Sequence, residues 1–252
     1  METPQYFETF PDFAFERTQS GVLTLRLHSA GEPALLSSRL HRDFPRVLSQ
    51  IADDRANRVL VLTGTGDHFM TEMDLTEDRQ AFKPLNWDEI FWEGRQVLRA
   101  LVDLPMPIVA AINGPATIHS EWVLLGDITI ASQTTHFQDL PHLGGEVVPG
   151  DGIHVVWEEL LGMNRARYAA LTQQVIQADE ALRLGMVNEV VPSSEVLPRA
   201  IELAESLAAR PSLLLRLTPL ALRQRLARRL EEGTTLGLAL EGLSMADKPY
   251  QN

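Results

Sequence analysis

Residues 105–115 have the sequence Pro-Met-Pro-Ile-Val-Ala-Ala-Ile-Asn-Gly-Pro, an apolar run of strand length bounded by proline and glycine. A run of this kind predicts a strand that is buried on both faces. Similar runs rich in Val, Ile and Leu recur along the chain, separated by long amphipathic segments. The predicted strands are 22–27, 58–63, 108–112, 128–132 and 187–191. This alternation indicates parallel strands joined by helical crossovers, and therefore an α/β fold.

Apolar positions with helical spacing occupy the segments between these runs. The candidate helices are 37–53, 87–104, 121–126, 164–171, 178–184, 194–209 and 211–232. Gly185 directly follows one of them, at the position where a left-handed residue commonly ends a helix. That helix therefore leads straight into the last predicted strand.

The chain has neither a stretch of linker composition nor an obvious internal repeat. We therefore predict one α/β core, residues 1–195, followed by a helical C-terminal region, residues 196–252. Arginines are concentrated in this last region, which indicates either an anion-binding surface or a helix that packs through leucines while its arginines face solvent. We favour the packing helix. The arginines are Arg210, Arg216, Arg223, Arg225, Arg228 and Arg229.

The composition excludes several classes of protein. Hydrophobic residues make up 44% of the 252 positions, enough for a sizeable core. The net charge of −12 argues against nucleic acid as a partner, because phosphate binding depends on clustered Lys and Arg. Cysteine is absent, so neither disulfides nor thiolate metal sites are available. The N-terminus has no signal-peptide pattern and no apolar run approaches the roughly 20 residues of a membrane span. We expect a cytoplasmic protein with no membrane partner.

Two irregular segments hold most of the chemically useful side chains. Residues 136–152 are His-Phe-Gln-Asp-Leu-Pro-His-Leu-Gly-Gly-Glu-Val-Val-Pro-Gly-Asp-Gly, and residues 113–121 are Asn-Gly-Pro-Ala-Thr-Ile-His-Ser-Glu. Loops that present such groups on a rigid scaffold are typical of catalytic sites. Considered alone, His119 is also compatible with a helix start and Asp151 with a turn.

Three segments taken together resemble the crotonase (enoyl-CoA hydratase/isomerase) superfamily. Residues 58–75 resemble its strand and oxyanion-hole loop, and residues 105–132 resemble the next strand, a second oxyanion loop and a helix. Residues 178–192, with Gly-Met-Val-Asn-Glu-Val-Val, resemble a third conserved stretch of the superfamily. The resemblance implies a crotonase-like spiral of ββα units with a helical C-terminal trimerisation region.

The departures from the superfamily pattern narrow the function. Most crotonases carry glycines after the Asn-Gly, where this chain has residues 117–120, Thr-Ile-His-Ser, and their Ala-Gly-Ala-Asp is replaced by residues 71–74, Thr-Glu-Met-Asp. Both changes argue against ordinary acyl-CoA handling. The same departures resemble the β-diketone hydrolase branch, typified by 6-oxocamphor hydrolase, which cleaves a carbon–carbon bond between two carbonyls. The closer match rests on residues 87–94, 113–119, 137–142, 148–157 and 236–241.

This resemblance implies four catalytic residues. His142 and Asp151 match a dyad that activates water, with the imidazole as base and the carboxylate on its other nitrogen. His119 matches a histidine that binds the attacked carbonyl and its oxyanion. Glu241 matches an acid that assists the departing enolate.

The shape of the substrate pocket depends on other positions. A substrate-contacting tryptophan of the branch corresponds to Leu35 or Leu36, so we expect a pocket of different shape. Core packing explains the aromatic candidates equally well. The predicted substrate-binding residues are Leu36, Met73, Trp87 and Phe91.

The sequence thus predicts a hydrolase that converts a cyclic or bicyclic 1,3-diketone and water to a keto acid by a retro-Claisen reaction. Its partner is the small-molecule diketone, and the family resemblance implies a homotrimer or a hexamer of two trimers. We expect no organic cofactor and no metal, because the spacing of His136, His142 and His154 fits none of the common zinc motifs.

Two alternatives remain open at this point. An enoyl-CoA hydratase or isomerase would use Glu121 as acid or base and the backbone N–H groups of Met73 and Ile118 as oxyanion hole. A non-catalytic crotonase-fold protein would bind a partner or assemble, and His142 would then be dispensable for that function.

Overall fold

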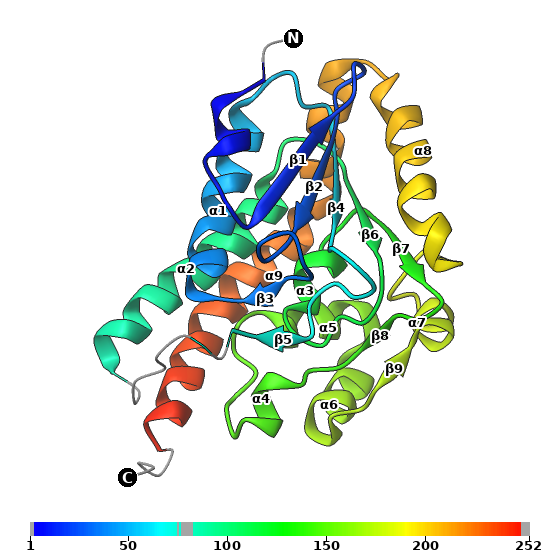
Figure 1. Ribbon diagram of the computed structural model, residues 1–252. Helices are drawn as coiled ribbons and strands as arrows, with labels where there is room; N and C mark the ends of the chain where they lie inside the picture. Colours follow the sequence, from blue (N-terminus) through cyan, green and yellow to red (C-terminus); the bar gives the residue numbers. More distant parts are fainter. Residues whose placement is uncertain (1–2, 75, 77–82, 248–252) are drawn as a thin grey trace.

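The computed structural model describes residues 3–74, 76 and 83–247. Within these residues the main sheet has six strands, in the order β1 (Phe13–Arg17), β2 (Val22–Leu27), β4 (Val59–Thr63), β6 (Ile108–Ile112), β7 (Ile128–Ser132) and β10 (Glu189–Val191). Neighbouring strands are parallel except β1 and β2, which are antiparallel (Figure 1). Strands β4 and β6 are buried at every position, as expected for parallel strands covered on both faces.

Helices cover the two faces of this sheet, and side-chain alternation along each strand divides the core. Val59 and Val61 of β4 pack against α8, whereas Leu60 and Leu62 point into the larger core under α1, α2 and α3 (Figure 1). The helices are α1 (Ser38–Asp53), α2 (Pro84–Asp103), α3 (Ser120–Leu124), α4 (Pro141–Gly144), α5 (Ile153–Leu161), α6 (Met163–Thr172), α7 (Ala178–Leu184), α8 (Val196–Ala208) and α9 (Ser212–Ala246), with 3-10 turns at Gln5–Glu8 and Ser193–Glu195.

A second layer of short strands follows the carboxyl ends of the main strands. β3 (Leu35–Leu36) pairs in parallel with β5 (Glu72–Met73), and β8 (His136–Phe137) pairs antiparallel with β9 (Ile176–Gln177). Single bridges join Met70 to Ala116 and Ala116 to Phe137. The chain thus repeats a strand, a short extended segment and a helix, which confirms the predicted spiral of ββα units.

Helix α9 is anchored along α2 and α5. The buried guanidinium of Arg223 bonds both carboxylate oxygens of Asp127 and donates to three backbone carbonyls between residues 101 and 106. Arg229 pairs with Glu158 and Glu159 of α5. These arginines hold the C-terminal helix on the core, which supports the packing interpretation for this part of the arginine group.

The predicted strands and most predicted helices are confirmed, and Gly185 ends α7 with a φ of +79°. The last helix does not end at residue 232. It continues through Gly233, because this glycine lies against Val155, where a Cβ would approach within 2.6 Å. The sequence analysis also missed β1 and α5. The predicted domain boundary at 195/196 coincides with the start of α8 and stays a prediction.

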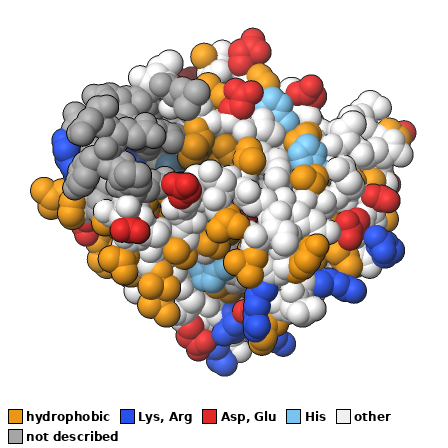
Figure 2. Space-filling view, turned by 90° about the horizontal axis from the view of Figure 1, so that it is seen from below, with side chains coloured by type: hydrophobic (Ala, Val, Ile, Leu, Met, Phe, Trp, Pro, Cys, Tyr) orange, Lys and Arg blue, Asp and Glu red, His pale blue; other side chains and the backbone are white. Residues whose placement is uncertain are grey.

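In the part of the chain that the structure describes, none of the helices combines the length and the apolar character that crossing a bilayer requires. Figure 2 shows the end of the molecule that lies opposite the N-terminus. Hydrophobic and uncharged groups make up most of this view, and the Lys and Arg side chains gather mainly toward one edge. The visible part of this end is therefore mainly apolar and uncharged.

Candidate active site

The four side chains predicted to be catalytic come together from four segments. His119 precedes α3, His142 lies in α4, Asp151 precedes α5 and Glu241 lies in α9. Oδ2 of Asp151 is 3.3 Å from Nδ1 of His119 and 3.5 Å from Nε2 of His142. Oε1 of Glu241 is 3.6 Å from the same Nε2. The structure thus brings these groups into one buried cluster, while their catalytic roles stay a prediction.

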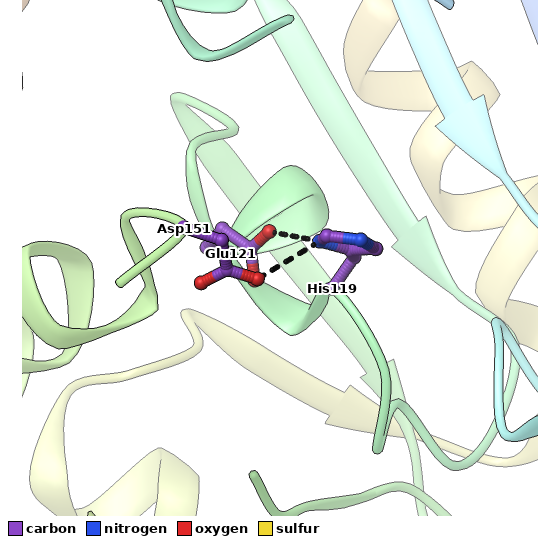
Figure 3. A group of neighbouring side chains, drawn as sticks. All are labelled: His119, Glu121 and Asp151. Atoms are coloured by element: carbon purple, nitrogen blue, oxygen red, sulfur yellow. Dashed lines mark hydrogen bonds and ion pairs between the residues drawn. The ribbon is translucent and has the colours of Figure 1, made fainter. Parts of the chain in front are cut away.

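His119 is fixed by its backbone and by its neighbours. Its φ of +47° lies in the left-handed region, which residues other than glycine rarely adopt. Nδ1 lies 2.7 Å from Oε1 of Glu121 as well as 3.3 Å from Asp151 (Figure 3). The ring stacks on Trp122, with centroids 4.2 Å apart and an angle of 8° between the planes. The Nδ1 edge therefore faces the carboxylates, and the Nε2 edge faces away from them.

The charge state of His119 depends on these two carboxylates. Burial opposes the charged imidazole, but the carboxylates of Glu121 and Asp151 raise the pKa of His119 above its usual value. Burial raises the pKa of Glu121 to about 7, and the negative charge of Asp151 adds to this effect. Both groups of the pair therefore keep a proton to a higher pH than they would in water.

His142 is oriented differently from the prediction. Its Nδ1 lies 2.6 Å from Oδ1 of Asp139, and both side chains are buried. Asp151 and Glu241 instead face Nε2. Asp139, rather than Asp151, occupies the position predicted for the orienting carboxylate. The sequence signal for Asp139 was an acid three residues before the histidine, at the start of a short helix.

The electrostatic surroundings of His142 bear on its predicted role as the base. Although burial opposes the imidazolium, the carboxylates of Asp151, Asp139 and Glu241 raise the pKa of His142 to about 12. The ring is then protonated on both nitrogens at neutral pH, and a base needs a free lone pair. The three carboxylates therefore favour a charged His142, while its role toward water stays a prediction.

The two carboxylates beside His142 differ in basicity. Burial opposes ionisation of Asp151, but the positive charges of His142 and His119 hold the pKa of Asp151 below its usual value. Burial raises the pKa of Glu241. Among the described residues, Oε2 of Glu241 has no hydrogen-bond partner although it is buried. Glu241 is therefore the more basic carboxylate of the two.

A contact between two glycines brings α9 against the turn that carries Asp151. A Cβ at Gly150 would lie 2.1 Å from the carbonyl oxygen of Gly237, and a Cβ at Gly237 would lie 2.4 Å from that of Gly150. Only glycine at both positions permits this approach. Glu241 follows Gly237 by about one helical turn. The glycine contact therefore holds the part of α9 that carries Glu241 against the turn that carries Asp151.

Sequence reasoning missed a third histidine beside the cluster. The ring of His41, in α1, lies 5.6 Å from that of His119, centroid to centroid. Its Nδ1 is 2.9 Å from Oε2 of Glu93 in α2. Burial lowers the pKa of His41, which favours a neutral ring. A single histidine within a predicted amphipathic helix gave no signal that separates it from a core residue.

Three of the predicted substrate-binding residues lie in apolar surroundings. Leu36 and Met73 are in register in the small sheet of β3 and β5, and Leu36 is buried. Phe91 is half-buried in α2, and its ring meets that of Trp92 edge to face at 5.6 Å. Their contact with a substrate stays a prediction.

Trp87, the fourth predicted substrate-binding residue, joins α2 to α9. Its Nε1 donates a hydrogen bond to the carbonyl oxygen of Leu238 at 3.2 Å. Its indole also covers Gly242, where a Cβ would lie 2.3 Å from Nε1. These contacts support the core-packing alternative for this residue.

One group of described residues has the spacing of metal ligands. Ligand atoms of His119, Glu121 and Asp151 lie within 4.8 Å of one another. The 2.7 Å separation of His119 and Glu121 is, however, that of a hydrogen bond. These side chains therefore form a hydrogen-bonded group whose nitrogen and oxygen atoms are as close together as the ligands of a metal ion.

The loop after β6 bears on the hydratase alternative. The N–H groups of Thr117 and Ile118 both donate to the carbonyl oxygen of Met70, at 3.0 and 3.2 Å. Ile118 provides one of the two amides that the alternative requires. Glu121, its acid or base, is fully buried and bonded to His119. Both groups are therefore already engaged within the protein.

Comparison with known proteins assigns the family. The sequence pattern of the family described as enoyl-CoA hydratase/isomerase matches residues 17–246. Together with the spiral of ββα units, this match shows that the chain belongs to the enoyl-CoA hydratase/isomerase family of the crotonase superfamily.

Individual relatives differ in their activities. A short-chain-enoyl-CoA hydratase from Clostridium acetobutylicum is 31% identical over 191 residues, covering 75% of this chain and 72% of the relative. A β-diketone hydrolase from the cyanobacterium Anabaena sp. PCC 7120, solved with (S)-3-oxocyclohexyl acetic acid bound, is 43% identical with a TM-score of 0.95, covering 98% of this chain and 99% of that one. An enoyl-CoA hydratase/isomerase from Mycobacterium paratuberculosis is 23% identical with a TM-score of 0.87, covering 94% and 95%.

Proposed function

We propose that this protein is a β-diketone hydrolase, a hydrolase acting on carbon–carbon bonds in ketonic substances. Its substrate is a cyclic or bicyclic 1,3-diketone, which it converts with water to a keto acid. The observation that carries the proposal is the buried cluster of His119, His142, Asp151 and Glu241. The two groups that a hydratase would use, the amide of Ile118 and the carboxylate of Glu121, are already hydrogen-bonded within the protein. The likeness to the Anabaena β-diketone hydrolase supports the same chemistry.

Two imidazoles suit a reaction in which negative charge develops on oxygen. We assign His119 to the attacked carbonyl, because its Nε2 edge faces away from the carboxylates (Figure 3). A donor preorganised toward an oxyanion contributes about 3 kcal/mol to catalysis. The charge of His142 offsets the neighbouring carboxylates, so that a departing enolate meets less repulsion.

Glu241 is the carboxylate best suited to accept a proton from water, because burial raises its pKa toward neutrality. In the proposed reaction, water gives a proton to Glu241 and its oxygen bonds to one carbonyl carbon. The bond from that carbon to the central carbon then breaks, and its electron pair stays on the central carbon as an enolate. Glu241 returns the proton there. The products are one carboxylic acid and one ketone, joined in a single molecule when the diketone is cyclic.

The proposal includes a homotrimer, single or paired as a hexamer, with α9 at the subunit contacts. Exposed leucines in the first half of α9 support this arrangement, because exposed apolar side chains are typical of an interface. Leu213, Leu214, Leu217 and Leu222 are between 54% and 74% exposed. Light scattering coupled to size-exclusion chromatography tests it, and a monomer at micromolar concentration contradicts it.

A panel of cyclic and bicyclic 1,3-diketones tests the proposed activity. It should include the bicyclic diketone whose cleavage yields 3-oxocyclohexyl acetic acid, the compound bound to the Anabaena relative. Loss of ultraviolet absorbance and mass spectrometry of the keto acid report turnover. We expect turnover by the wild-type protein and a far larger loss of kcat than of binding in His142→Ala and Asp151→Asn.

Crotonyl-CoA is the matched control substrate. Catalytic hydration of crotonyl-CoA without cleavage of any diketone would refute the proposal in favour of a hydratase. If neither class of substrate is turned over, the non-catalytic alternative replaces it.

A further inference from the structure

Glu121 is a buried acid that the proposed mechanism leaves without a task. Its side chain is completely buried, and Oε1 bonds to Nδ1 of His119 at 2.7 Å. Oε2 has no hydrogen-bond partner among the described residues. A buried carboxyl with an unsatisfied oxygen destabilises the fold, so its presence at the carbonyl-binding histidine calls for a functional reason.

The proton count of the His119–Glu121 pair gives that reason. An imidazole can donate toward a carbonyl oxygen from Nε2 only if Nε2 carries hydrogen. When the pair holds two protons, one lies between Nδ1 and Oε1 and the other is on Nε2. Nε2 then carries hydrogen whether the pair is imidazolium with carboxylate or neutral imidazole with carboxylic acid. A neutral His119 that keeps only its Nδ1 proton would instead present a lone pair to the carbonyl.

We propose that Glu121 is a positioning residue that keeps an N–H on the Nε2 of His119, directed at the substrate carbonyl. The inference rests on the proposed function, in which His119 binds that carbonyl. A hydratase would use this acid for proton transfer to the substrate. Here Glu121 acts instead through the side chain of His119.

Other charged groups near His119 cannot replace Glu121. Asp151 reaches the same Nδ1 only at 3.3 Å and also lies 3.5 Å from Nε2 of His142. His142 and His41 act in the opposite direction. Positive charge on His142 lowers the pKa of His119, and positive charge on His119 lowers the pKa of His41. Glu121 therefore makes the shortest contact that favours protonation of the ring.

Glu121→Gln tests the inference, with Asp12→Asn as the matched control. Asp12 is also buried but pairs with Arg39 and not with a histidine. We expect Glu121→Gln to lower the pKa of His119 by about 1 to 3 units, as measured by nitrogen-15 NMR of the imidazole. Fewer rings are then protonated as the pH rises, so kcat relative to wild type should be lower at pH 8 than at pH 6. Asp12→Asn should shift neither measurement.

Two results would overturn the inference. One is an unchanged titration of His119 in Glu121→Gln, and the other is an equal loss of kcat at both pH values, which indicates a structural role. Should the variant not fold, the wild-type spectrum decides, because an unprotonated Nε2 at pH 7 contradicts the proposal. The NMR titration needs no substrate. If no diketone is cleaved, the proposed function therefore fails while the role of Glu121 is still decided.

Discussion

Asp139→Asn perturbs the carboxylate that holds His142. The substitution keeps the size of the side chain and the oxygen that lies 2.6 Å from Nδ1, but it removes the negative charge. Three carboxylates raise the pKa of His142 to about 12, and this change removes one of them. We expect the pKa of His142 to fall by about 1 to 3 units. The imidazole then stays protonated at pH 7 and titrates within the measurable alkaline range.

Stability and rate should both decrease in this variant. A buried hydrogen bond to a charged group contributes about 1.5 to 3 kcal/mol to stability. For a chain of this size, that loss lowers Tm by roughly 3 to 12 °C. The ring of His142 is also less firmly directed toward Asp151 and Glu241, and displacements of about 1 Å reduce rates up to roughly a hundredfold. We therefore expect kcat to fall by about ten- to a hundredfold.

The assay combines nitrogen-15 NMR titration of His142, thermal melting and steady-state kinetics with the best diketone of the panel. Asp12→Asn is the control, since its carboxylate is as buried as that of Asp139 and likewise bonds a basic side chain. The control should lose stability without changing the titration of His142. An unchanged titration together with a kcat within twofold of wild type refutes the assignment of Asp139.

Three further predictions concern charge and packing at the same site. The folded pKa of His142 lies above its unfolded value near 6.5, so its contribution to the free energy of unfolding is complete below pH 6.5 and is lost as pH rises toward about 12. Urea denaturation from pH 7 to 10 should show this decline in wild type and a smaller decline in His142→Gln. Equal slopes of stability against pH in the two proteins contradict the prediction. Glu241→Gln should lower kcat by about a hundredfold or more with little change in KM; a change confined to KM rules out the proton-transfer role. Gly237→Ala places a Cβ 2.4 Å from the carbonyl oxygen of Gly150 and should destabilise the protein by about 1 to 3 kcal/mol while lowering kcat. Leu236→Ala, at an exposed neighbouring position, is the control and should have neither effect. A native Tm and kcat in Gly237→Ala disprove the packing argument.

The fold was predictable where local sequence decides the structure. The run at 108–112 is apolar throughout because β6 is buried on both faces, and its strand bounds agree with the prediction. Gly185 ends α7 because it adopts a left-handed conformation that other residues rarely tolerate. The end of α9 was missed because Gly233 indicates a helix end locally, whereas its contact with Val155 can be known only from the packing of α9 on α5.

Four members of the site were predictable from the sequence, but Asp139, His41 and the contacts that each group makes were not. Asp139 and Asp151 both lie near His142 in sequence, and spacing alone does not say which nitrogen each one faces. Glu241 lies about a hundred residues further along the chain, yet its carboxylate helps to set the charge of His142. His41 reaches the cluster only because α1 packs beside α3.

Short apolar runs, turn glycines and motif spacing are local properties of the chain, and they were enough to predict the α/β spiral, the family and the grouping of His119, His142, Asp151 and Glu241. The contact of Asp139 with His142, the raised pKa of His142 and the bond between Glu121 and His119 all arise only in the folded chain. The physical reason is that hydrogen-bond partners and pKa values depend on distances and burial, which arise when α4, α9 and the turn before α5 meet.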